Sequence, residues 1–115
     1  MKRIVIASVS VLSLLASVGV ASAQNVAKGK QVYTDQKCSM CHSIAGQGNP
    51  KGVLDGVGGK LTADEIRQWI TDPATMATTA KADRKPAMST MAARFKSMSK
   101  DDLDALVAYL ASLKK

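Results

Sequence analysis

The chain has 115 residues, which is room for one domain, and a formal net charge of +7. It contains only one Phe, one Trp and two Tyr, and a domain of this size buries only about 60% of its unfolded surface. This composition excludes a small domain that is stabilised by an aromatic core of its own. A disulfide, a metal or a large cofactor is expected to supply what the side chains lack.

The first 23 residues have the pattern of a secretory signal peptide. Met1–Arg3 is positively charged, an apolar run continues from Ile4 to Val20, and Ala21–Ala23 is a small-residue cleavage site. We expect a cut after Ala23 that leaves an exported, periplasmic domain of residues 24–115, with no membrane association. The alternative is an uncleaved anchor, but the run is near the lower length limit for a spanning helix and carries four serines.

Two segments in the first two thirds of the chain have helical periodicity. In the first, Asn25 is placed to cap a helix, whose inward face would be Val26, Gly29, Val32 and Tyr33. In the second, Thr62–Glu65 fits a capping box, with Leu61 and Ile66 spaced for a hydrophobic staple. Asp72-Pro73 ends this helix, and its inward face would be Ile66, Trp69 and Ile70.

A third helix is predicted from Ser99 onward. Acidic Asp101 and Asp102 lie in its first turn and Lys114-Lys115 at its end, as the helix dipole favours. Its apolar face would be Leu103, Leu106, Val107, Leu110 and Leu113. The connections 45–60, with six glycines and one proline, and 73–98 show no strand-like alternation. The predicted fold class is all-α, with long loops that carry function or wrap a bound group.

The pentapeptide from Cys38 through Cys41 to His42 is C-x-x-C-H, the haem-attachment motif. Two thiols at this spacing can add to the two vinyl groups of a porphyrin, and the adjacent histidine is then held under the iron. A zinc site would need four Cys or His ligands, more than this sequence contains. A thioredoxin-like motif belongs near a βαβ pattern, which is absent. A plain disulfide would leave the histidine unexplained.

From Val26 to Leu113 the chain resembles the class I c-type cytochromes, which carry one haem. The helix before the motif has Gly29 and Tyr33, and the last helix reads Leu-Val-Ala-Tyr-Leu over 106–110. In that family the first and last helices cross, and a glycine permits the close approach of an aromatic residue. The resemblance gives these two roles to Gly29 and Tyr109.

The resemblance also places Trp69 on a middle helix that lines the haem pocket, and it includes one departure. The family usually has a proline just before a Leu-x-Gly segment, and the proline carbonyl holds the ring of the ligating histidine. Here Leu54–Gly56 matches that segment, but the proline position is Gly52. The sequence therefore leaves open which carbonyl accepts a hydrogen bond from His42.

A methionine thioether is the usual second axial ligand in this family. Met76 and Met98 are best explained as core filling, which leaves Met88 and Met91. Met88 ends a Pro-x-Met arrangement similar to the family's ligand loop, whereas Met91 is better spaced from the last helix, 18 residues before Tyr109. We favour Met88, with Met91 as the alternative.

With His42 and Met88 on the iron of one covalent haem c, no site is open for substrate. We expect a monomeric one-electron carrier of an exported electron-transfer chain, not an enzyme. Lys81, Arg84 and Lys85 would steer docking to an acidic redox partner, unless they form only a solvated face. Nucleic-acid binding is not expected. The alternatives are a haem subunit fixed to a larger oxidase or dehydrogenase, and an open-site haem sensor or peroxidase.

Overall fold

The protein is described by a computed structural model that covers residues 17–114. Residues 1–16 and Lys115 lie outside the described residues, so the charged start and most of the apolar run of the expected signal peptide do too. Within the described range, no helix combines the length and the apolar character needed to cross a membrane.

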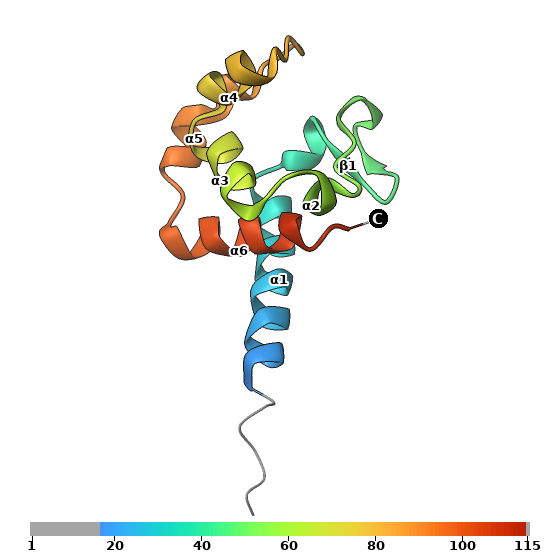
Figure 1. Ribbon diagram of the computed structural model, residues 1–115, viewed down its shortest axis with the longest axis vertical. Coiled ribbons are helices and arrows are strands. Elements are labelled where there is room, and N and C mark those ends of the chain that lie inside the picture. Colours follow the sequence, from blue (N-terminus) through green and yellow to red (C-terminus); the bar gives the residue numbers. More distant parts are fainter. Residues whose placement is uncertain (1–16, 115) are drawn as a thin grey trace, which may run out of the picture.

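Helices dominate the fold, as predicted for an all-α domain (Figure 1). The α-helices are α1 (Ser17–Asp35), α2 (Val57–Lys60), α3 (Ala63–Thr71), α4 (Pro73–Ala80), α5 (Ala92–Lys96) and α6 (Lys100–Ala111). The 3-10 helices are η1 (Cys38–Met40), η2 (Pro50–Gly52) and η3 (Met88–Met91). Two short antiparallel strands are β1 (Ser43–Ile44) and β2 (Gln47–Gly48).

Helices α1 and α6 cross in close contact, and α3 packs on α6 beside them (Figure 1). A Cβ atom at Gly29 would overlap the carbonyl oxygen of Ala105 and would lie 2.5 Å from Cβ of Tyr109. Only glycine allows so close an approach. The crossing also brings the rings of Tyr33 and Tyr109 edge to face, with centroids 6.0 Å apart. The roles expected for Gly29 and Tyr109 are therefore confirmed.

The buried core is formed by the apolar faces of these three helices. Its members are Val32, Tyr33, Ile66, Ile70, Leu106, Val107, Tyr109 and Leu110. Leu103 and Leu113 are partly buried against it. Helical periodicity thus predicted the inward faces, with the exception of Trp69, which is only half-buried.

The predicted starts of α3 and α6 are confirmed. The Thr62 hydroxyl accepts a hydrogen bond from the Glu65 amide at 3.2 Å, and the Glu65 carboxylate accepts one from the Thr62 amide at 3.0 Å. Leu61 packs against the core that contains Ile66, as a staple requires. The Ser99 hydroxyl caps α6 by accepting a bond from the amide of Asp102 at 3.1 Å.

Two predicted helix ends are wrong. Asn25 does not cap α1 but lies within it, because no proline interrupts the preceding residues 17–24 and the helix continues through them. The last helix ends at Ala111, before Lys114, and beyond its end the Leu113 carbonyl accepts a hydrogen bond from the Gly58 amide of α2 at 2.9 Å.

The segment 45–60 is more structured than the sequence indicated. It contributes β2, η2 and α2, and β1 and β2 form a hairpin where no strand was expected. The hairpin turn places Ala45 at φ 51° and Gly46 at φ 78°, and two successive positive φ values are what a tight hairpin turn requires. Strands of two residues are too short to show alternation in a sequence.

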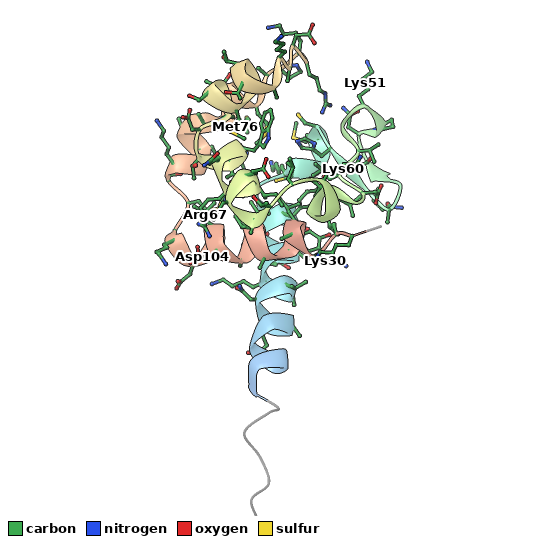
Figure 2. The ribbon with its side chains drawn as sticks, viewed as in Figure 1. Lys30, Lys51, Lys60, Arg67, Met76 and Asp104 are labelled. Carbon is green, nitrogen blue, oxygen red and sulfur yellow. The ribbon has the colours of Figure 1, made fainter. Side chains whose placement is uncertain are left out.

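The segment 73–98, expected to be a loop, contains α4, η3 and α5. Pro73 is tolerated at the first position of α4 because no helical partner exists there for its missing N–H. Arg94 ties α5 to the end of α1, since its guanidinium donates to the Gln36 side chain at 3.1 Å and to the Asp35 carbonyl at 3.2 Å. Arg67 of α3 pairs with Asp104 of α6 at 2.7 Å (Figure 2).

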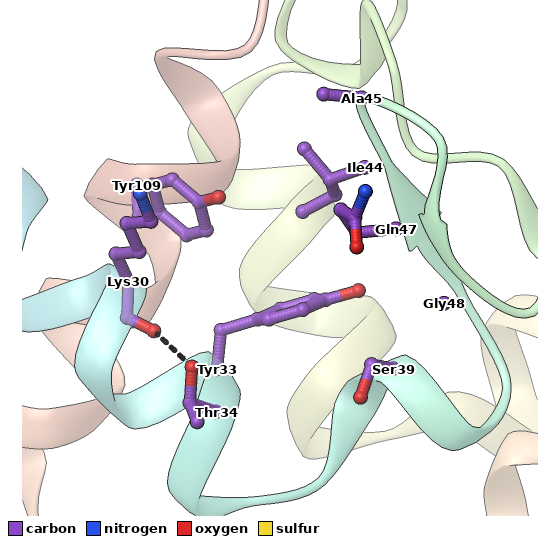
Figure 3. A pocket seen from close by; sticks show the side chains of 9 residues that line it. All are labelled: Lys30, Tyr33, Thr34, Ser39, Ile44, Ala45, Gln47, Gly48 and Tyr109. Atoms are coloured by element: carbon purple, nitrogen blue, oxygen red, sulfur yellow. Dashed lines mark hydrogen bonds between the residues drawn. The ribbon is translucent and has the colours of Figure 1, made fainter.

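A cavity of about 410 Å³ lies beside the aromatic pair (Figure 3). Lys30, Tyr33 and Tyr109 line it on the helix side, and Ile44 and Gln47 line it on the hairpin side. The Tyr33 hydroxyl points toward the hairpin and has no hydrogen-bond partner among the described residues. Burial raises the pKa of Tyr33 to about 12, and nearby Cys38 and Tyr109 add to the rise.

Replacing Gly29 with Ala should destabilise the protein by about 1–3 kcal/mol, because the methyl group would force α1 and α6 apart. Gly59→Ala is the matched control, since a Cβ there meets no atom within 4 Å. Guanidinium unfolding followed by circular dichroism measures both. Equal stability of the two variants would contradict the close crossing.

Replacing Tyr33 with Phe should not reduce stability at neutral pH, because it removes a buried hydroxyl that has no hydrogen-bond partner among the described residues. In the wild type the unfolded tyrosine ionises near 10.0 and the folded one near 12. The unfolded state therefore loses its proton first, and stability falls as pH rises through that window. Unfolding curves at about pH 9 and about pH 11 should show a smaller loss for Tyr33→Phe. An equal loss would show that Tyr33 does not titrate differently on folding.

Candidate functional site

The C-x-x-C-H segment forms one tight turn immediately after α1. Lys37 breaks the helix with a left-handed conformation at φ 57°, and η1 follows. The amides of Cys41 and His42 both donate to the Cys38 carbonyl, at 3.1 and 2.9 Å. The two cysteines are free and half-buried. One turn of backbone thus presents two thiols and an imidazole from the same short segment.

The ring of His42 is oriented by the carbonyl of Gly52, 3.0 Å from Nδ1. A carbonyl oxygen only accepts, so Nδ1 carries the proton and Nε2 keeps its lone pair free for a metal. Burial lowers the pKa of His42, and Arg84 lowers it further, while the bond to Gly52 opposes them. The neutral imidazole that a metal ligand requires is therefore favoured.

The sequence did not identify the carbonyl that accepts the hydrogen bond of His42. It is the carbonyl of Gly52, at the position where the family usually has proline. A Cβ at Gly52 would overlap the Cys41 carbonyl oxygen and Arg84 Nη1, and would lie 2.9 Å from His42 Nδ1. The absence of a side chain at this residue lets η2 approach the histidine closely.

Asn49, the residue that follows the hairpin, holds the backbone of the motif in place. The sequence did not indicate this role. The Asn49 amide lies within hydrogen-bond distance of the carbonyls of Ser39 and His42, at 3.1 and 3.0 Å. Its side chain donates to the Met40 carbonyl at 3.1 Å. These bonds fix the backbone of the turn on both sides of Cys41. Backbone carbonyls have no sequence signature. The one local signal at this position is the Asn-Pro dipeptide that Asn49 begins, which is typical of a turn.

The Cys38 thiol does not have the properties of a redox-exchange cysteine. Burial raises its pKa to about 11, although Arg94 acts in the opposite direction. Disulfide oxidoreductases instead lower the pKa of the attacking cysteine in their C-x-x-C motif. The thioredoxin-like reading is therefore unfavourable on electrostatic grounds as well as on fold.

The two methionine candidates lie at the ends of one short helix. Met88 begins η3 and Met91 ends it, and both are half-buried. Side chains three residues apart eclipse one another in a 3-10 helix, so the two thioethers leave the helix on the same side. The choice between them stays a prediction. Met98 packs against the core, as expected, and Met76 lies half-buried on α4 (Figure 2).

Arg84 differs from the sequence interpretation, which treated it as one of three surface charges. Its side chain is half-buried, and Nη2 donates to the Cys41 carbonyl at 2.5 Å. Lys81 and Lys85 on either side of it are exposed. Of that group, the two lysines alone have no ion pair or hydrogen bond from their side chains to the described part of the chain.

These residues fit a covalently attached haem. The two thiols are unpaired and lie on one turn, and the adjacent imidazole has its Nδ1 engaged so that Nε2 faces away from Gly52. Trp69, which is half-buried while Ile66 and Ile70 of the same helix are buried, retains surface with which to cover such a group. The large apolar surface of a porphyrin would complete a core that has few aromatic side chains.

Comparison with known proteins agrees with this geometry. Residues 26–114 match the family described as Cytochrome c. The chain is also 29% identical, over 96 residues, to "Cytochrome c oxidase subunit 2" of Alkalihalophilus pseudofirmus, an overlap that covers 76% of this chain and 25% of that protein. The chain thus spans about a quarter of that relative's length. No solved structure matches it. The chain belongs to the cytochrome c family, as a class I c-type cytochrome that binds haem c covalently, with Cys38 and Cys41 placed as its attachment motif.

Proposed function

We propose that the protein is a one-electron carrier of an exported electron-transfer chain. Cys38 and Cys41 hold the haem, and His42 and Met88 are its axial ligands, with Met91 as the alternative to Met88. The observation that carries the proposal is the bond between His42 Nδ1 and the Gly52 carbonyl, which leaves Nε2 as the ligand atom. When bound, the haem supplies reversible one-electron exchange at its iron.

Two protein ligands on the iron would restrict the haem to electron transfer. His42 and Met88 would both bind the iron, so no iron position would remain open for a substrate. A thioether ligand raises the reduction potential. No catalytic acid, base or nucleophile is proposed.

Exposed groups around the motif suit a transient redox partner. Met40, within the attachment motif, is 69% exposed, and Val53, next to Gly52, is 59% exposed. Lys81 and Lys85 are exposed on the segment that leads to Met88. Exposed apolar residues at the motif, together with exposed lysines on the segment before Met88, would be complementary to a partner with an acidic surface.

Export remains part of the proposal, with cleavage after Ala23 and a periplasmic location for residues 24–115. Among the α1 side chains that the structure describes, the buried ones are Val32 and Tyr33, and both follow the cleavage site, as does Gly29. Removal of the segment before Gln24 would therefore leave the crossing with α6 intact.

A second candidate function is a haem domain fixed to a larger oxidase. The likeness to "Cytochrome c oxidase subunit 2" favours it, because there a stretch of similar sequence belongs to a chain about four times as long. A free carrier would purify as a monomer after gentle extraction, whereas a fixed subunit would co-purify with its oxidase.

The ferric protein should show the weak long-wavelength band that marks an iron–methionine sulfur bond, and Met88→Ala should abolish it. Met91→Ala should retain the band and serves as the control, because both substitutions remove a half-buried methionine from η3. Loss of the band in Met91→Ala alone would exchange the two assignments. A wild type that lacks the band and binds carbon monoxide readily when ferrous would instead support the open-site alternative.

The rate of electron transfer to an acidic redox protein should fall as ionic strength rises from about 10 to about 300 mM, because salt screens the lysines. Lys81→Gln and Lys85→Gln should weaken this dependence. Lys28→Gln on α1 is the charge-matched control, since its ion pair with Asp102 is exposed and 3.6 Å long. Flat kinetics across the salt range would remove electrostatic steering from the account.

A further inference from the structure

We propose that Arg84 is a positioning residue, whose side chain tethers the segment leading to the methionine ligand against the haem-attachment turn. That segment, residues 81–88, is called the methionine loop below. The inference rests on the proposed function in one respect, that a methionine of η3 binds the iron.

The tether is a single contact between segments far apart in sequence. Nη2 of Arg84 donates to the Cys41 carbonyl at 2.5 Å, across 43 residues of chain. The hydrogen bond is charge-assisted and half-buried, which makes it stronger than an exposed neutral one. Nη1 occupies the space that a Cβ of Gly52 would need, so the missing side chain of Gly52 makes room for the guanidinium.

The methionine loop has few other attachments. At its start, the amides of Lys81 and Ala82 donate to the carbonyls of α4, and at its end Thr90 of η3 donates to the Ala87 carbonyl. From Asp83 to Pro86, the contact of Arg84 is the only hydrogen bond or ion pair that the structure gives within residues 17–114. A stretch with so few bonds opens easily once its tether is lost.

The hydrogen bond of Arg84 links the segment that precedes the proposed methionine ligand to the segment that carries His42. Cys41 immediately precedes His42, and the guanidinium lies against Gly52, whose carbonyl orients the imidazole. Arg84 thus joins the segment of the proposed methionine ligand to the segment of the histidine. Its loss should loosen the methionine while leaving the bond between His42 and Gly52 in place.

The competing explanation is that Arg84 is one more cation near a docking surface. Lys85 separates the two cases, because it is the next residue on the same loop, is exposed, and makes no hydrogen bond to any residue of the range 17–114. Arg84→Gln and Lys85→Gln each remove one positive charge, but only the first removes the tether. Arg84→Lys keeps the charge and replaces a planar multidentate donor with a single ammonium.

The first experiment measures loop opening in the haem-loaded protein. Trypsin cleavage after Lys81 is followed by mass spectrometry, and this site is present in the wild type and in all three variants. Arg84→Gln should be cleaved at least about tenfold faster, in keeping with the loss of one charge-assisted bond. Lys85→Gln should match the wild type, and Arg84→Lys should be intermediate.

The second experiment measures how easily the sixth ligand is displaced. Imidazole binding to the ferric protein is followed by absorption, and imidazole is chosen because its neutral form does not respond to a lost protein charge. The rate should rise by about the same factor in Arg84→Gln and stay at the wild-type value in Lys85→Gln. A purely structural defect would lower thermal stability without this selective change.

The outcomes can be told apart. Equal behaviour of Arg84→Gln and Lys85→Gln in both assays would overturn the tether and leave Arg84 as a surface charge. If Arg84→Gln does not accumulate, Arg84→Lys decides, because a role in charge alone requires it to match the wild type in both assays. Absence of the iron–methionine band in the wild type would contradict the proposed function, while proteolysis would still decide whether Arg84 holds the loop.

Discussion

The contact on which the rest of this structure depends is the crossing of α1 and α6 at Gly29. The missing side chain lets the helix backbones approach so closely that a methyl group would overlap the Ala105 carbonyl. That crossing fixes the direction in which α1 ends, and the attachment turn begins three residues after its last residue, Asp35. α3 packs on the same α6, so the helix that carries Trp69 is placed by the same contact.

Around the attachment turn, backbone groups do most of the positioning. Carbonyls of η2 and of the motif itself accept bonds from His42 and Arg84, and Asn49 holds the turn from the hairpin side. The site is therefore rigid on its histidine side. Among the described residues, the segment from Asp83 to Pro86 makes one hydrogen bond, from the Arg84 side chain.

The features that could be predicted from the sequence are those that depend on the type and spacing of nearby side chains. The capping box at Thr62, the cap at Ser99 and the apolar faces of three helices follow from local chemistry and period, and the attachment motif follows from spacing. The Gly52 carbonyl was not predictable, because every residue carries the same acceptor. The bond of Arg84 was missed because a contact across 43 residues leaves no local pattern.

The covalent bonds from Cys38 and Cys41 to the haem can be tested by mass spectrometry of the haem-loaded protein. One haem per chain should stay attached after acid unfolding and, after digestion, should remain on the peptide that contains Cys38 through His42. The double variant Cys38→Ala with Cys41→Ala should yield a chain without attached haem. A wild type whose haem is extracted by acidic organic solvent, with both thiols free to alkylation, would show that the haem is not covalently attached.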